Sequence, residues 1–245
     1  MQSLNRRIKT KAKAATMDGI LNLDKPAGIT SAGALNRIKR LVPKGTKIGH
    51  AGTLDPFATG VLLVLVGRAT KCCERLMGAA KQYEATMKFG ATTSTDDLDS
   101  PEQPYPSEHP IQPIPRQQIE AVLPRFIGSI QQRPPAFSAM KVKGRRAYDL
   151  ARRGMTVNLE PRTVQIHSIE LLQYAWPFLE LRIDCGRGTY IRSIARELGE
   201  ALDVGGFLMA LRRTRIGDFF ASDAVSLETL EKDGIQKHLK LMSFP

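Results

Sequence analysis

Residues 50–67 read HAGTLDPFATGVLLVLVG, a glycine-rich loop that runs directly into an apolar stretch. GVLLVLVG, at residues 60–67, has the length and the aliphatic, β-branched composition of a buried strand. The loop before it carries one carboxylate, Asp55, and the Pro56 that follows fixes the backbone after it. Glycines on both sides allow tight bends. The stretch therefore predicts a strand that presents a single aspartate on a turn at its start.

Short strands and helices of moderate length alternate on both sides of this stretch. A cap at Thr30 or Ser31 predicts a helix with Leu35, Ile38 and Val42 on one stripe. We expect a second helix in GTYIRSIARELGEAL at 188–202, and further strands in GILNLDK at 19–25, KQYEATMKF at 81–89, RTVQIHSIELLQY at 162–174 and FLELRIDCG at 178–186. Because no regular βαβ repeat is present, the order favours an α+β domain built on a large mixed or mostly antiparallel sheet flanked by helices and loops.

Length and charge limit the possible functions. A chain of 245 residues can form one large domain, or one domain with a small appendage. Its 36 Lys and Arg against 24 Asp and Glu leave a net charge of +12, which indicates a polyanionic partner. The alternative is a surface charge that serves solubility.

Cysteine content and hydropathy predict a soluble intracellular chain. Cys72, Cys73 and Cys185 form neither a disulfide framework nor a CxxC metal pattern, which fits a reducing compartment. The N-terminus has no apolar core of a signal peptide, and the longest apolar run is too short to span a bilayer. We therefore expect no contact with a membrane.

Two segments are expected to be irregular. Residues 1–17 carry many basic groups with little periodicity, which predicts a flexible basic arm. Residues 91–115, ATTSTDDLDSPEQPYPSEHPIQPIP, are rich in Pro, Ser and acidic groups and predict a long surface loop. A loop of that length is usually functional or disordered.

The surroundings of Asp55 in the sequence exclude several kinds of site. The loop has no second carboxylate, no histidine four residues on and no cysteine, so it supports neither a metal site nor a paired-carboxylate glycosidase. It also matches neither a phosphate-binding P-loop nor a dinucleotide fingerprint. A lone aspartate can still act as a covalent nucleophile or a base. The ordinary alternative is an Asx turn.

Five blocks, in this order, resemble the TruB family of tRNA pseudouridine synthases. They are NLDKPAGITS at 22–31, HAGTLDPFATGVL at 50–62, KQYEATMKFG at 81–90, RPPAFSAMKVKGRRAY at 133–148 and CGRGTYIRSIARELG at 185–199. The resemblance implies the pseudouridine synthase catalytic fold over residues 18–220. It also implies that 221–245 form a short C-terminal appendage and that a full accessory RNA-binding domain is absent.

The resemblance implies a cytoplasmic, monomeric isomerase that converts the uridine at position 55 in the T arm of tRNA to pseudouridine. Asp55 matches the catalytic aspartate, which breaks the N-glycosidic bond so that the base can rejoin through C5. No cofactor and no metal are required. Attack at ribose C1′ and proton removal at C2′ both remain open as the first step.

Arg192 matches the arginine that pairs with this aspartate and would keep the pKa of Asp55 low. Tyr83 matches the tyrosine that contacts uracil and can help to remove the C5 proton.

Further positions match residues that bind the RNA or support the site. His50 matches a ring that stacks near the flipped base, and Tyr190 and Leu211 match side chains packed around it. The expected phosphate-binding surface comprises Lys141, Lys143, Arg145 and Arg146, and Arg212 and Arg213 continue its charge. The expected supports of the catalytic loop are Lys25, Pro26, Gly52 and Thr53.

Each of these residues also has an ordinary structural interpretation. Without the resemblance, Arg192 would be a surface helix residue, Tyr83 and Leu211 would be core residues, and the charged run would be a solvated face. Two rival functions are a guide-RNA-dependent synthase, which would normally carry a full accessory domain, and a tRNA-binding chaperone without activity. A chaperone does not need Asp55, Tyr83 and Arg192 together.

Overall fold

The computed structural model describes residues 17–107, 109–138, 140–142, 145–151, 153–155 and 159–241. The expected basic arm, apart from Met17, lies outside these ranges. Within them, no helix is long and apolar enough to cross a membrane.

The described chain contains six α-helices, four 3₁₀ turns and fourteen strands, several of them very short. The helices are α1 (Ser31–Lys39), α2 (Cys73–Gly78), α3 (Arg116–Val122), α4 (Ala147–Ala151), α5 (Ile191–Ala201) and α6 (Leu227–Asp233). The 3₁₀ turns are η1 (Gly67–Cys72), η2 (Leu123–Phe126), η3 (Ala221–Asp223) and η4 (Gln236–His238). The strands are β1 (Gly19–Lys25), β2 (Ile48–His50), β3 (Thr59–Val66), β4 (Lys81–Phe89), β5 (Ala91–Thr92), β6 (Gln103–Pro104), β7 (Gly128–Gln132), β8 (Lys141–Val142), β9 (Arg145–Arg146), β10 (Arg162–Ala175), β11 (Phe178–Cys185), β12 (Gly206–Ile216), β13 (Phe219–Phe220) and β14 (Leu239–Lys240).

One large sheet organises the fold, in the order β14-β1-β3-β12-β4-β11-β10-β7, with β2 beside β3 and β13 beside β12. All its strand pairs are antiparallel except β3 and β12. That parallel pair spans only two positions, Arg212 opposite Thr59 and Arg213 opposite Gly60. The expected α+β fold with a mixed, mostly antiparallel sheet is therefore confirmed. Only two residues of β3 pair with two residues of β12, so the connection between these two strands is very short.

Strand composition explains which faces the sheet buries. Along β4, Tyr83, Ala85, Met87 and Phe89 are buried and the residues between them are half-buried, as expected of a strand with one covered face. In contrast, β3 is buried from Gly60 to Val66, because elements cover both of its faces. Its continuous apolar sequence reflects that double coverage.

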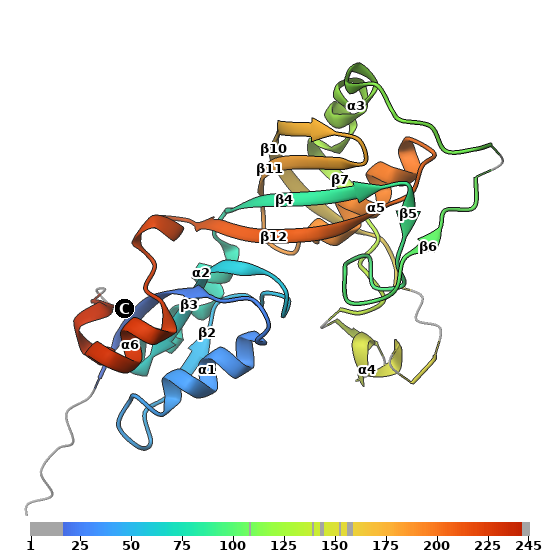
Figure 1. Cartoon of the computed structure of the whole chain (residues 1–245). Coiled ribbons are helices and arrows are strands. Elements are labelled where there is room, and N and C mark those ends of the chain that lie inside the picture. The colour runs from blue at the N-terminus through green and yellow to red at the C-terminus, as the bar shows by residue number, and fades with distance from the viewer. Residues whose placement is uncertain are drawn as a thin grey trace, which may run out of the picture.

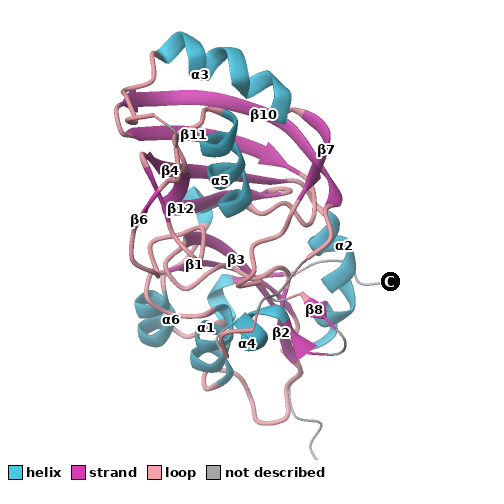
Figure 2. Ribbon diagram, turned by 90° about the vertical axis from the view of Figure 1, so that its right-hand side faces the viewer, coloured by secondary structure: helices cyan, strands magenta, loops and turns pink. Residues whose placement is uncertain are grey.

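The helices form separate layers on two lobes of the sheet (Figures 1 and 2). In the upper lobe, α5 and α3 pack against β4, β10 and β11 around the largest apolar core. In the lower lobe, α1 and α6 cover one face of β1 and β3. A third cluster, with residues of η1 and α2, covers the other face of these two strands. The lobes meet where β3 touches β12.

Two local expectations have clear outcomes. Thr30 is the cap of α1, since its Oγ1 accepts a 2.9 Å hydrogen bond from the Gly33 amide. Ile38 is buried on α1, and Leu35 packs half-buried against the same core. Val42 is buried there too, but it lies beyond the end of the helix at Lys39, so the expected helical stripe is shorter than predicted.

The 91–115 segment is largely irregular, as expected, but it is tied to the fold. It contains the two short strands β5 and β6, and Ile111 and Ile114 pack against the upper core. The Tyr174 hydroxyl donates a hydrogen bond to the Ile114 carbonyl. Glu108 lies outside the described residues.

The junction of the lobes requires a residue without a side chain at position 60. Gly60 has a φ of +98°, and a Cβ there would lie 2.2 Å from the Arg213 carbonyl oxygen. We predict that Gly60→Ala lowers the free energy of unfolding by about 2 kcal/mol or more, since it adds strain and a backbone clash. For a chain of this length the melting temperature should fall by roughly 4 °C or more. Urea and thermal unfolding measure both quantities.

Gly49→Ala is the matched control, because Gly49 lies in the neighbouring β2 and a Cβ added there would meet no other atom within 4 Å. It should leave stability nearly unchanged. Equal stability of the two variants would contradict the tight junction.

Candidate active site

Asp55 lies in the loop between β2 and β3, just before the short contact that joins β3 to β12. Its side chain is 31% exposed. Among the described residues, no group of three His, Cys, Asp or Glu side chains is placed to hold a metal ion. The chemistry of this loop therefore centres on one carboxylate and the groups that surround it.

A buried lysine supports the loop from the side of β1. Lys25 is fully buried, and its Nζ donates hydrogen bonds to the carbonyls of Pro26 at 2.7 Å, Ile29 at 2.8 Å and Pro56 at 3.1 Å. These bonds connect the loop after β1 to the residue that follows Asp55. Burial lowers the pKa of Lys25 to about 8, and the Asp55 carboxylate opposes this shift.

A serine holds the residue on the other side of Asp55. Ser31, at the start of α1, is buried, and its Oγ accepts a 2.8 Å hydrogen bond from the Leu54 amide. The same hydroxyl donates to the Leu54 carbonyl at 3.0 Å. Both backbone groups of Leu54 are thus satisfied by one side chain.

A buried arginine of β12 completes this support and corrects one expectation. Arg213 was expected on the basic surface, but it is only 1% exposed. Its guanidinium donates to the carbonyls of Val61 at 2.7 Å, Gly52 at 3.2 Å and Thr53 at 3.3 Å. Arg213 and Tyr83 are register partners on β12 and β4, where Tyr83 is among the buried residues of the covered face. By contrast, Arg212 faces the other side and pairs with Asp24 at 2.9 Å.

Arg192, at the start of α5, lies between two carboxylates. Its Nη2 donates a 3.1 Å hydrogen bond to Asp55 Oδ1, and its Nε lies 3.0 Å from Asp55 Oδ2. Its Nη1 is 3.1 Å from Asp97 Oδ2 and also donates to the Thr95 carbonyl. Because the Arg192 side chain is only 5% exposed, these contacts fix the guanidinium in one orientation. The position is buried, unlike that of an ordinary surface helix residue.

Charges around Asp55 act in opposite directions. Burial raises the pKa of the Asp55 carboxyl, Arg192 lowers it, and Asp97 and Asp99 raise it again. The net shift is upward, which differs from the expectation that Arg192 keeps this pKa low. The reason is that the carboxylate loses water and shares its guanidinium with a second carboxylate.

Asp97 is the site residue that sequence reasoning missed. Its side chain is 3% exposed, and besides Arg192 it accepts hydrogen bonds from Thr95 Oγ1 at 2.6 Å and the Asp99 amide at 3.0 Å. The preceding Asp96 pairs with Arg196, one helical turn after Arg192. Two consecutive aspartates and two arginines at i and i+4 of a helix were the available signal.

Tyr83 and Leu211 lie on the neighbouring strands β4 and β12, and each is 7% exposed. Burial raises the pKa of the Tyr83 phenol, which favours its protonated form. Tyr190 directly precedes α5, and Arg162 stacks on its ring at 4.9 Å. His50 ends β2 half-buried, and its Nδ1 has no hydrogen-bond partner among the described residues. Burial lowers the pKa of His50, with a further contribution from Arg213.

The expected phosphate-binding surface can be placed only in part. Lys141 lies in β8, and Arg145 and Arg146 lie in β9, which pairs with β8. The side chains of these three residues and all of Lys143 lie outside the described part of the chain.

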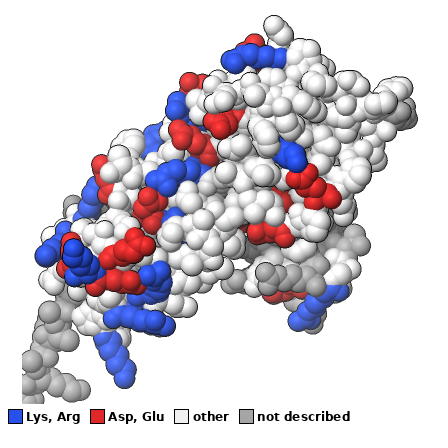
Figure 3. All heavy atoms as spheres, viewed as in Figure 1, with Lys and Arg blue, Asp and Glu red and all other residues white. Residues whose placement is uncertain are grey.

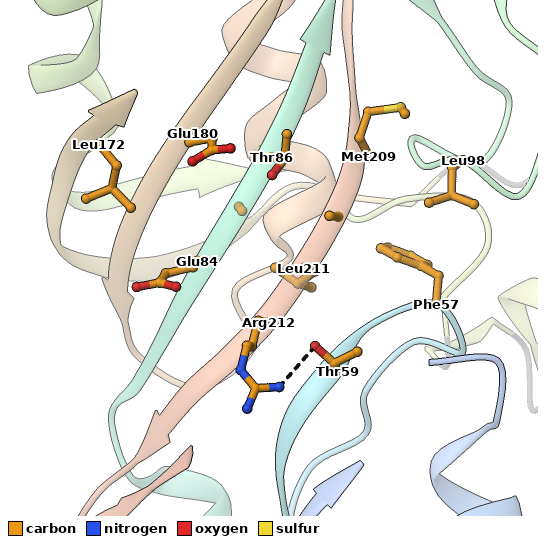
Figure 4. Close-up of a pocket in the computed structure, with 12 residues that line it drawn as sticks. Phe57, Thr59, Glu84, Thr86, Leu98, Leu172, Glu180, Met209, Leu211 and Arg212 are labelled. Atoms are coloured by element: carbon orange, nitrogen blue, oxygen red, sulfur yellow. Dashed lines mark hydrogen bonds between the residues drawn. The ribbon is translucent and has the colours of Figure 1, made fainter. Parts of the chain in front are cut away.

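A pocket of about 300 Å³ opens where the sheet divides (Figure 4). Phe57 and Leu98 contribute apolar side chains to it, and on its wall Arg212 donates a 3.4 Å hydrogen bond to Thr59 Oγ1. Glu84 and Thr86 of β4 also line it, and they alternate along that strand with the buried Tyr83 and Ala85. The pocket therefore lies on the sheet face opposite to α5.

Comparison with known proteins identifies close relatives over most of the chain. A profile described as "TruB family pseudouridylate synthase (N terminal domain)" matches residues 39–191, and one described as "tRNA pseudouridylate synthase B C-terminal domain" matches residues 192–240. The chain is 46% identical to a tRNA pseudouridine synthase B of Azoarcus sp. (strain BH72), over 91% of this chain and 73% of the relative. It is 47% identical to the tRNA pseudouridine synthase B of Phocaeicola vulgatus, over 86% of this chain and 90% of the relative.

The solved structures agree in fold. A chain from the crystal structure of a Cbf5-Nop10-Gar1 complex matches with a TM-score of 0.67 and 31% identity, over 90% of this chain and 57% of that chain. A chain from an H/ACA RNP bound to a substrate RNA containing 2′-deoxyuridine matches with a TM-score of 0.64 and 29% identity, over 90% and 56%.

The hydrogen bonds of Ser31 generate one prediction. Ser31→Ala should lower the free energy of unfolding by about 1–3 kcal/mol, because it leaves both backbone groups of Leu54 without partners. The Leu54 amide should also exchange its hydrogen faster, which hydrogen-exchange NMR measures. The matched control is Thr30→Ala, which removes a helix cap worth about 1 kcal/mol but does not touch the loop. A Leu54 amide as protected in Ser31→Ala as in the control would contradict this role.

The charges around Asp55 generate a second prediction for this site. Arg192→Gln should raise the pKa of Asp55, since a positive neighbour is lost, whereas Asp97→Asn should lower it, since a negative neighbour is lost. Carboxyl ¹³C NMR titration of Asp55 in each variant measures the shift. Shifts in the same direction would show that the pair does not control Asp55 in the way described.

Proposed function

Because the chain belongs to the TruB family of pseudouridylate synthases, we propose that it modifies the uridine at position 55 in the T arm of tRNA, with Asp55 as the reacting carboxylate. The chain is an enzyme of the tRNA pseudouridine synthase class. The target position and the residue roles are the proposal. The observation that carries them is the ion pair of Asp55 with the buried Arg192.

The reaction breaks the bond between ribose C1′ and uracil N1 and forms one between C1′ and C5. In one route Asp55 attacks C1′ and uracil leaves with the bonding electrons, after which C5 attacks C1′ and expels the carboxylate. In the other, Asp55 removes the C2′ proton and uracil leaves by elimination, after which C5 adds to C1′ of the resulting double bond and Asp55 returns the proton to C2′. Both routes end with loss of the C5 proton and protonation of N1. Both need an ionised carboxylate whose basicity is not suppressed, which agrees with a pKa of Asp55 raised by burial.

Arg192 is the orienting partner of the carboxylate. Its two contacts with Asp55 fix the plane of the carboxylate, and its contact with Asp97 fixes the guanidinium in turn. Asp97 is a positioning residue in this proposal, because it acts on Asp55 only through Arg192.

The proposal assigns uracil binding to four further residues. Tyr83 contacts the uracil ring, and since burial raises the pKa of its phenol, it needs an acceptor for its own proton before it can take the one on C5. Leu211, beside it on the sheet, and Tyr190, before α5, pack around the base. Burial lowers the pKa of His50, which favours its neutral form, and in the proposal its ring stacks in place of the extruded base.

The remaining roles concern RNA contact and support of the loop. Lys141, Lys143, Arg145 and Arg146 contact phosphates in the proposal. Lys25, Pro26, Gly52 and Thr53 support the loop, which agrees with the bonds of Lys25 to Pro26 and of Arg213 to Gly52 and Thr53.

The proposed enzyme works as a cytoplasmic monomer without a cofactor. The three cysteines are free, which agrees with a reducing compartment such as the cytoplasm.

Asp55→Asn tests the central role. The amide is nearly isosteric but a poor nucleophile and base, so the single-turnover rate on a tRNA transcript should fall by roughly a thousandfold or more, about 4 kcal/mol of barrier. Binding to tRNA should stay within a few-fold of the wild type. Tritium release from C5-labelled uridine measures the rate, and filter binding measures the affinity.

Asp24→Asn is the matched control, since Asp24 is a partly exposed carboxylate of the same lobe and pairs only with Arg212 among the described residues. It should retain activity. Normal turnover by Asp55→Asn, once deamidation has been excluded by mass spectrometry, would refute the assignment.

A further inference from the structure

A second cluster of cations lies on the lower lobe, away from the expected phosphate-binding surface. Residues 37–47 read RIKRLVPKGTK, with five cations and no carboxylate. Arg37 is neutralised by Glu231 at 2.7 Å. The other four, Lys39, Arg40, Lys44 and Lys47, are exposed, and none has an ion pair with a described carboxylate. We call these four residues the α1–β2 basic surface.

The backbone that carries this surface is ordered. Ile38 and Val42 are buried in the lower core and fix the end of α1. The turn that follows is closed by Thr46, whose amide and Oγ1 both donate to the Pro43 carbonyl, at 3.1 and 2.7 Å. The Lys47 carbonyl accepts a 2.7 Å bond from the Gly67 amide. The cations therefore stand on a fixed turn, which reduces the entropy lost when they bind a ligand.

On one other part of the described surface, arginines are neutralised by carboxylates. On the open sheet face, Arg182 pairs with Glu84 and Glu170, Arg215 pairs with Asp184, and Arg212 pairs with Asp24. Figure 3 shows blue and red side chains interspersed over much of this side, whereas blue side chains project alone at the lower edge, around α1 and the loop after it. The sheet face is thus electrically balanced, and the lower edge is not.

A structural role accounts for only half of the surface. Lys39 and Arg40 lie at the C-terminal end of α1, where cations stabilise the helix dipole. That effect fades within the last turn, so it does not explain Lys44 and Lys47, which lie beyond it. Among the described residues, neither Lys44 nor Lys47 makes an ion pair that would stabilise the fold.

The surface is directly connected to the candidate site. Lys47 precedes β2, which ends at His50, and Asp55 follows five residues later. Three residues of strand cover about 10 Å, so Lys47 lies within a few nucleotides of a base held near His50. A polyanion bound at Asp55 can therefore reach this edge of the lower lobe.

We propose that the α1–β2 basic surface binds backbone phosphates of the RNA stem that carries the target uridine. The inference rests on the proposed function, because it takes the RNA held at Asp55 as the ligand. This surface would recognise the charge of the phosphates and the shape of the RNA duplex, and the recognition would not depend on base sequence. The stem is then held on the lower lobe, by cations other than those of residues 141–146.

The test uses the double variant Lys44→Ala with Lys47→Ala, made in the Asp55→Asn protein so that binding is measured without turnover. Two lost phosphate contacts should lower the slope of log K against log salt concentration by about 1.4 to 1.8. At moderate salt the affinity should fall roughly tenfold or more. The ligands are a full tRNA transcript and its isolated T-arm stem-loop, and both should lose affinity to the same extent.

The control is Arg116→Ala with Arg125→Ala, which removes two exposed arginines at the far end of the upper lobe, one of them paired with Glu120. It should leave affinity and slope unchanged. With Asp55 intact, the Lys44 and Lys47 variant should reach the wild-type single-turnover rate at saturating RNA. An unchanged salt slope would overturn the proposal, and so would a loss of affinity for the full tRNA alone, which would place the contact away from the stem.

These outcomes are distinct from failure of the proposed function. That failure would appear as a wild-type protein that forms no pseudouridine in the stem-loop. An active wild type with an unaffected double variant would leave the proposed function intact and remove only this surface from it.

Discussion

Hydrogen bonds from three buried side chains to the backbone around Asp55 are the constraint on which this structure depends. The loop between β2 and β3 has few ladder partners for its own backbone, and a buried carbonyl without a partner costs about 1–3 kcal/mol. Lys25, Ser31 and Arg213 supply the missing partners from β1, α1 and β12. The position of one carboxylate is therefore set by three elements that are far apart in the sequence.

The same arrangement controls the charge of the site. Lys25 and Arg213 bring positive charge next to the loop but direct their donors at carbonyls, so neither forms an ion pair with Asp55. Arg192 does form that pair, but Asp97 shares its guanidinium. Asp55 is thus oriented firmly while its pKa remains raised by burial. A carboxylate that is held in place and still basic suits either of the two first steps considered above.

Much of the fold could be predicted from local patterns. The alternation in KQYEATMKF and the continuous apolar run before residue 67 predicted β4 and β3, and the threonine before α1 predicted its cap. Asp55 could be singled out because its loop has a distinctive composition. By contrast, β12 was not recognised as a long strand, because GFLMALRRTRI places adjacent arginines in its middle. Along this strand Arg212 faces solvent and Arg213 is buried, so the alternation between the two faces is hidden in the sequence.

The missed features share a physical cause. Arg213 and Asp97 are charged residues whose burial is tolerated only because their partners come from distant segments. Local periodicity carries no information about such partners, and only whole-family likeness indicated Arg192, since its burial beside Asp55 has no local signature.

The contact between Arg213 and Gly52 joins positions 161 residues apart, and this separation governs when the site can form during synthesis. At about 5–20 residues per second, a ribosome needs roughly 8–32 s to make the intervening chain. Throughout that interval the Asp55 segment is already made but lacks the donor that fixes it. The nascent protein therefore emerges with the Asp55 loop unassembled, and the candidate site forms only once β12 has joined the sheet.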